Sequence, residues 1–286
     1  MIWRIIFMVD YRNLVLEKGY IGDNYNPFEI NGIKEVIDII DDVISKHTNI
    51  LIYAPGTLDG VLSTSILMLA LRYLKLNVYH YIYDDDQEFD IDGFNEHIEL
   101  MRVDIVFSLN KIIEIDSPIK IINISNKEKD TVNSSKYILI NPYSDDCVYS
   151  FKDLTLPALT YKILEGISRF YNLKSMVKFL DLVFISLFND NVKVYGENYK
   201  LLKEGSYFLK NTKNYGLREL VKISSNNITI NELINFIDPE YINKNKVTNA
   251  RLIVELLTVS NSLKANQICK YLIKEVNCKL EEKSWI

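Results

Sequence analysis

The chain has 286 residues, of which 48% are hydrophobic, enough for one large α/β domain or two small ones with a sizeable core. Its formal net charge of −5 excludes a global basic field, so any contact with nucleic acid requires a local patch or a partner protein. Three widely separated cysteines, Cys147, Cys269 and Cys278, predict reduced thiols in a cytosolic protein.

The first segments in chain order predict a strand, a helix, a strand and a second helix. Residues 1–10 are apolar but too short to span a membrane and lack a cleavage site, so they predict a first strand and no membrane contact. Residues 33–45 carry apolar side chains at helical spacing. An apolar strand at 50–53 then leads through a loop into a helix from about Ser63 to Leu74.

The next segments predict further strands of a sheet. Residues 78–83 are aromatic and β-branched, as in a strand, and the acidic run 84–90 that follows favours a solvated loop over a cation site. Three short apolar runs with few charges predict strands that are covered on both faces: 104–109, 119–124 and 137–142.

The second half of the chain predicts helices almost throughout. The expected helices are 156–171, 176–188, 197–209, 216–223, 230–237, 250–258 and 263–276. We therefore predict an α/β fold with a mainly parallel sheet flanked by helices. Residues 1–153 would form its α/β part, and residues 154–286 a helical part that continues the same domain.

The loop after the strand at 50–53 is the first of several segments that resemble the DHH phosphoesterase superfamily, and RecJ-like proteins in particular. That family has a strand followed by D-x-D-x-D-G-[VT]-x-S-[TA]. The matching positions are Asp59, Gly60, Ser63 and Thr64. Pro55 and Thr57 stand where the family has its first two aspartates.

The second and third motifs of the family are altered as well. Asn110 occupies the aspartate position at the end of the strand 104–109. Ser125 and Asn126 lie where the name-giving Asp-His-His would be, and no histidine is present there. Asp190 falls at the fourth acidic position. Further segments that resemble the family are 140–154, 180–190, 195–198 and 211–217.

The resemblance implies a divalent metal site, of which this sequence keeps only Asp59 and Asp190. Two-metal phosphodiester hydrolysis needs several carboxylates and histidines that converge on the ions. We therefore expect no catalytic residues, no cofactor and no bound metal. His47, His80 and His97 fall outside the matching loops.

The retained residues also have purely structural explanations. Asp59 could accept hydrogen bonds from free N–H groups at the helix start, with Ser63 and Thr64 capping that helix. Asp190 could cap a turn at the end of the preceding helix.

A RecJ-like domain with a degenerate metal site is similar to the Cdc-forty-five type of replicative helicase subunit, known from archaea and eukaryotes. The family's distal DHHA1-type domain, with its Gly-Gly-His motif, is not expected in this chain. The resemblance implies a non-catalytic scaffold that assembles with the GINS complex and the MCM ring in DNA replication. The protein would then be cytoplasmic and chromosome-associated. The alternative is a divergent metal-dependent phosphoesterase or single-strand exonuclease.

A third possibility is a module that binds single-stranded DNA in the old substrate groove. Basic residues on the helices that could contribute are Lys200, Lys203, Lys210, Lys213 and Arg218. The aromatic candidates for a partner interface are Trp3, Tyr81, Tyr83, Phe89 and Trp285. The sequence does not assign the interface or DNA-binding residues further.

Overall fold

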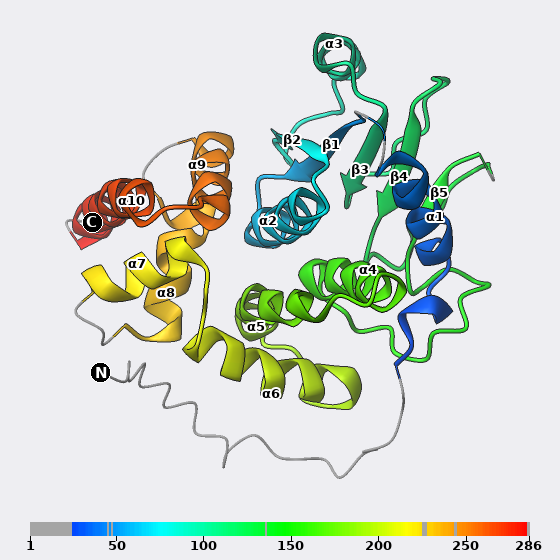
Figure 1. Cartoon of the computed structure of the whole chain (residues 1–286). Coiled ribbons are helices and arrows are strands. Elements are labelled where there is room, and N and C mark those ends of the chain that lie inside the picture. The colour runs from blue at the N-terminus through cyan, green and yellow to red at the C-terminus, as the bar shows by residue number, and fades with distance from the viewer. Residues whose placement is uncertain are drawn as a thin grey trace.

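A parallel sheet of five strands, in the order β2-β1-β3-β4-β5, forms the centre of the first half of the chain (Figure 1). The computed structural model describes residues 25–284 apart from 45, 47, 135, 225–227, 243 and 244. The prediction of an α/β fold with a mainly parallel sheet is confirmed. The strand expected at 1–10 and the residues Trp3, His47 and Trp285 lie outside the described residues.

The strands follow the apolar runs of the sequence. They are β1 Asn49–Pro55, β2 Asn77–Tyr83, β3 Ile105–Leu109, β4 Lys120–Ile124 and β5 Ile138–Ile140. The parallel register pairs Tyr53 with Ser108 and Ser108 with Asn123, so the carboxyl ends of β1, β3 and β4 meet at one edge. Open α/β sheets place their ligands at that edge, which makes it the place to look for a site.

Helices cover both faces of the sheet and form nearly all of the second half of the chain (Figure 1). The α-helices are α1 Ile33–Val43, α2 Leu58–Tyr73, α3 Ile91–Met101, α4 Leu156–Phe170, α5 Leu180–Asn189, α6 Gly196–Lys210, α7 Tyr215–Ile223, α8 Ile230–Ile237, α9 Lys246–Thr258 and α10 Ser262–Ser284. The short 3-10 helices are η1 Pro27–Glu29, η2 Lys174–Phe179 and η3 Pro239–Tyr241. None of the helices in the described ranges combines the length and apolar character that a membrane crossing requires.

Successive side chains of β1 point to opposite faces of the sheet and join two separate parts of the hydrophobic core. Ile50 and Ile52 join the main cluster, which includes α1, α2 and α4 and runs on to α10, whereas Leu51 and Tyr53 pack with Phe94 of α3. Side chains that alternate along a strand point to opposite faces, so both faces must be covered. The division of the chain at residue 153 stays a prediction.

Two helix boundaries differ from the sequence-based prediction. The helix expected from about Ser63 begins at Leu58, because the Thr57 hydroxyl accepts the Gly60 N–H at 3.1 Å and caps it there. Ser63 and Thr64 are therefore not caps but lie inside the helix, and both are fully buried.

The helix expected at 176–188 is divided into η2 and α5. Over six residues, apolar spacing does not distinguish a 3-10 turn from an α-helical one, so the sequence pattern could not reveal this boundary.

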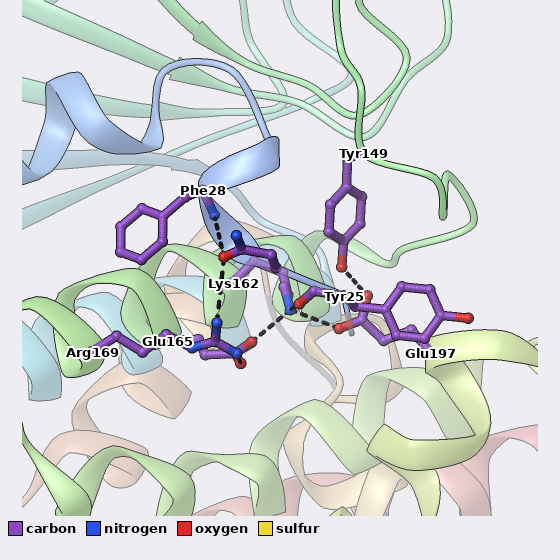
Figure 2. Close-up of polar contacts among 8 residues, drawn as sticks. Tyr25, Phe28, Tyr149, Lys162, Glu165, Arg169 and Glu197 are labelled. Atoms are coloured by element: carbon purple, nitrogen blue, oxygen red, sulfur yellow. Dashed lines mark hydrogen bonds and ion pairs between the residues drawn. The ribbon is translucent and has the colours of Figure 1, made fainter. Parts of the chain in front are cut away.

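A buried ionic cluster ties the connection after β5 to α4 and α6 (Figure 2). The Lys162 ammonium lies 2.8 Å from Glu197 Oε1 and 2.5 Å from Glu165 Oε2, and it also donates to the Tyr25 carbonyl at 2.8 Å. The Tyr149 hydroxyl donates to the other oxygen of Glu197. Because the Lys162 side chain is only 1% exposed, these partners replace its water almost completely.

Candidate functional site

The first loop of the site is the junction between β1 and α2, from Pro55 to Gly60. The Thr57 side chain is engaged as the helix cap. Gly60 lies so close to β1 that a Cβ atom there would stand 2.1 Å from the Pro55 carbonyl oxygen. The glycine of the Asp-Gly pair is therefore required by the close approach of helix and strand, independently of any chemistry.

The second loop follows β3, where Asn110 adopts a left-handed backbone conformation with φ of 53°. Its N–H donates to the Ile124 carbonyl at 2.8 Å, and its side-chain oxygen accepts the Asn126 N–H at 3.3 Å. Asparagine tolerates this backbone region better than most residues. The Asn110 side chain thus links the second loop to the third.

The third loop follows β4 and uses its polar side chains to hold neighbouring backbone. The Ser125 hydroxyl donates to Asp130 Oδ2 at 2.6 Å and accepts the Lys127 N–H at 3.1 Å. The Asn126 amide donates to the Leu154 carbonyl at 3.0 Å, just before α4 begins. These contacts give both side chains a structural role.

The two retained carboxylates, Asp59 and Asp190, come together where α2 begins and α5 ends. Ser186 of α5 donates its hydroxyl to Asp59 Oδ1 at 2.7 Å, and the backbone of Leu156 makes a further hydrogen bond to Asp59. Burial, and then the charge of Asp190, raise the pKa of Asp59 to about 7. Burial also raises the pKa of Asp190. The expected juxtaposition of these two acids is therefore present.

The expected role of Asp59 at the start of α2 is wrong, because Thr57 supplies the cap and Asp59 instead connects α2 to α5 and to the backbone of α4. Asp190 is the residue that ends α5, and its N–H donates to the Ser186 carbonyl at 2.9 Å. Its carboxylate accepts a hydrogen bond from the Asn189 amide at 3.3 Å.

Two lysines that the sequence did not single out also lie at these loops. Lys127 Nζ donates to the Asn110 carbonyl at 3.3 Å. The side chain of Lys246, at the start of α9, lies beside Gly56 and pairs with Asp85 at 2.9 Å and Glu240 at 3.3 Å. These two acids balance the charge of Lys246, whereas Lys127 places positive charge at the rim of the loops, which opposes the binding of a divalent cation.

The donor set does not fit a two-metal centre. Within the described ranges, no three residues among histidine, cysteine, aspartate and glutamate are grouped so that they could hold a metal ion. His80 lies in β2 and His97 in α3, away from the three loops. The neutral oxygens of Thr57 and Asn110 already accept hydrogen bonds from the backbone. A metal-assisted reaction needs charged ligands that converge on the ion, and Asp59 and Asp190 are too few for a pair of ions.

Replacing Asp59 with asparagine is expected to stabilise the fold above pH 7 and to have little effect near pH 4. The pKa of Asp59 rises from 3.8 to about 7 on folding, so the folded state retains a proton that the unfolded chain has already lost. The free energy of unfolding therefore falls as pH rises between these values. The asparagine variant carries no charge at this position, so its free energy of unfolding does not fall in this way. The change in the pKa of Asp59 corresponds to about 4 kcal/mol in the free energy of unfolding. Because the Asp59 side chain is partly exposed, water screens its charge, and we expect about 1–2 kcal/mol.

Urea unfolding of the wild type and of the Asp59→Asn variant between pH 4 and pH 8 measures this effect. Asp190→Asn is the matched control: it removes the neighbouring charge but leaves the buried carboxylate, so its effect should be smaller. A difference in unfolding free energy that stays constant across this pH range would contradict the proposed electrostatic origin.

Comparison with known proteins supports the expected relationship to RecJ. No protein-family model matches the chain. The single-stranded-DNA-specific exonuclease RecJ of Bacillus subtilis (strain 168) is 27% identical over 264 residues, which is 86% of this chain and 33% of that protein. The chain thus spans about a third of the length of the curated relative that it matches.

Solved structures show the same fold. A crystal structure of exonuclease RecJ bound to manganese matches with a TM-score of 0.72 and 16% identity, over 87% of this chain and 66% of that one. RecJ in complex with Mn²⁺ from Thermus thermophilus matches with a TM-score of 0.71 and 18% identity, over 87% and 38% of the two chains. The α/β architecture described above is therefore the DHH-domain fold of RecJ.

Proposed function

We propose that this chain is a non-catalytic RecJ-like domain that acts by binding other macromolecules. The observation that carries the proposal is the use of the altered loop residues as structural ties: Thr57 caps α2 and Asn110 joins two loops. A site whose polar groups are engaged in this way, with Lys127 at its rim, is poorly suited to collect divalent ions. The intact packing around it is compatible with a surface for assembly.

The test is to look for metal-dependent hydrolysis and to try to restore the lost ligands. We expect no manganese-dependent cleavage of a single-stranded oligonucleotide by the purified wild type. In a Thr57→Asp/Asn110→Asp variant, both new carboxylates are compatible with their backbone positions, since aspartate also caps helices and tolerates the left-handed region. Manganese should raise the melting temperature of this variant but not that of the wild type.

For the partners, we propose assembly with the GINS complex and the MCM ring of the replicative helicase. This assignment rests on the sequence resemblance to the inactive RecJ-type helicase subunit. Affinity purification from the native cell, followed by identification of the bound proteins, is the direct test. Recovery of GINS or MCM subunits supports the assignment, and a protein recovered without either of them contradicts it.

One observation favours a second function, that of a divergent phosphoesterase. Asp59 and Asp190 lie close enough for the charge of one to raise the pKa of the other, as expected for two ligands of a single cation. Manganese-dependent hydrolysis by the wild type that disappears in both Asp59→Ala and Asp190→Ala would establish this function and overturn the non-catalytic one.

A further inference from the structure

A wide groove of about 1040 Å³ lies between α2 and the edge strand β2 on one side and α9 and α10 on the other. It is separate from the three loops described above. The apolar part of its lining comes from four side chains, Met68, Met101, Leu252 and Val259. Figure 1 shows α9 beside α2, with α10 beyond α9 and β2 at the edge of the sheet nearest to α9. We call this feature the α2–α9 groove.

The charged lining of the α2–α9 groove is mainly positive. Arg72, Arg251 and Lys264 line it, together with Glu255. Lys264 pairs with Glu255 at 2.5 Å, whereas neither arginine forms an ion pair with any residue in the described part of the chain. The Arg251 guanidinium lies over the ring of Tyr81, 5.6 Å from its centroid. The groove therefore presents two arginines that form no ion pair with its acidic side chain, Glu255.

A second hollow of about 230 Å³ adjoins the groove at residues 258–260, which line both. It adds Lys178 and Lys213, and Lys178 lies near enough to Asp181 of the same hollow for its charge to lower the pKa of that acid. Its one acid, Asp181, is buried, and burial raises its pKa to about 7. The positive surface thus continues past the carboxyl end of α9.

The opposite end of the groove meets negative charge. A third hollow shares Tyr81 and Arg251 with the groove and is rimmed by Asp84, Glu88 and Asp90 of the acidic run. A strand of nucleic acid, which carries a charge on every unit, would be repelled there. A peptide can instead place a few acidic residues at the arginines and apolar residues elsewhere. Arginine, tyrosine and methionine, all present in this lining, are enriched at protein interfaces.

We propose that the α2–α9 groove is the docking site for an acidic peptide segment of a partner protein, which binds Arg72 and Arg251 through carboxylates and the partly exposed Met101, Leu252 and Val259 through apolar side chains. This inference rests on the proposed function, because it assigns a binding surface to the proposed role in assembly. It differs from binding of DNA in the old substrate groove in both position and ligand.

The experiment measures binding of a labelled synthetic peptide of glutamate, leucine and phenylalanine to the full chain by fluorescence anisotropy. Two other probes are the same peptide with lysine in place of glutamate, and an oligothymidylate of equal charge. We expect the glutamate peptide alone to bind, and Arg72→Glu/Arg251→Glu to weaken it at least about tenfold. Lys34→Glu/Lys120→Glu, on exposed positions of α1 and β4, is the charge-matched control and should bind normally.

His80, which lines the groove, provides a second readout that does not depend on charge-reversed variants. The chain has only three histidines, so its ring signals can be followed by NMR. Burial, then Arg72 and Arg251, lower the pKa of His80 to about 4, with Glu255 acting in the opposite direction. Bound carboxylates should raise this pKa, and so should the milder Arg72→Gln/Arg251→Gln variant without peptide.

Three outcomes would overturn the proposal: no binding of the glutamate peptide, binding that the arginine variants leave unchanged, or tighter binding of the oligothymidylate that the same variants abolish. The last result would assign the groove to nucleic acid. Hydrolytic activity is measured separately, so a catalytic wild type would overturn the proposed function while the peptide result still decides the use of the groove.

Discussion

Replacing Lys162 with methionine is expected to lower the free energy of unfolding by about 3–5 kcal/mol at neutral pH. The side chains of Lys162 and Glu197 are 1% and 3% exposed, and their 2.8 Å contact is the main compensation for the burial of both charges (Figure 2). Without the ammonium, the Tyr149 hydroxyl is the one hydrogen-bond donor to the Glu197 carboxylate that remains among the residues described. A small domain has a total stability of about 5–15 kcal/mol, so this loss is severe.

The pH dependence of the loss identifies its cause. Burial already raises the pKa of Glu197, and Lys162 opposes that rise. In the methionine variant the pKa of Glu197 should rise further, so protonation at lower pH relieves the unpaired charge and recovers part of the stability. Urea unfolding near pH 7.5 and near pH 5 measures the recovery. A loss of stability that is equal at both pH values would indicate lost packing instead.

Two further variants make this test specific. Lys136→Met removes a lysine from an exposed pair with Asp116, and should change stability little because water already solvates both groups. The double variant Lys162→Met/Glu197→Leu removes both buried charges and should recover much of the stability lost in the single variant. If it is no more stable than Lys162→Met, the unpaired carboxylate is not the source of the loss.

The sequence predicted features that depend on neighbouring residues and missed features that join residues far apart along the chain. The strands at 50–53 and 104–109 are local apolar runs, and the pattern placed them correctly. The hydrogen bond from Ser186 to Asp59 joins residues 127 positions apart, and no local pattern indicates it. Lys162 is similar: it lies on α4, and its buried partner Glu197 comes from a different helix.

The candidate site shows the same division between local and long-range information. The resemblance assigned Thr57 and Asn110 to two motifs of one metal site, and the parallel pairing of β1 with β3 brings the ends of these strands to the same edge of the sheet. The engagement of those side chains in capping and loop-to-loop bonds emerged only from the folded chain. Lys246 reaches the first loop from α9, nearly two hundred positions away in the sequence, which explains why it was missed.

Replacing Gly60 with alanine is expected to destabilise the protein by about 3 kcal/mol or more. The new Cβ would stand 2.1 Å from the carbonyl oxygen of Pro55 and 2.9 Å from its Cγ, and neither atom belongs to a flexible side chain that could move aside. The start of α2 would have to shift away from β1. Because α2 also packs against α4, α5 and α9, that shift would disturb the centre of the core.

Gly56, in the same loop, provides the matched control. The atoms nearest to a Cβ at Gly56 lie 3.5 Å away, so Gly56→Ala should be tolerated and could stabilise the fold by up to about 1 kcal/mol. Thermal unfolding of the two variants without added metal measures the difference between them. A large loss for Gly60→Ala alone would mean that tight packing is sufficient to retain the glycine of the Asp-Gly pair, independently of any hydrolytic activity. Equal stability of the two variants would contradict this explanation and would indicate that Gly60 is retained for the chemistry of the loop.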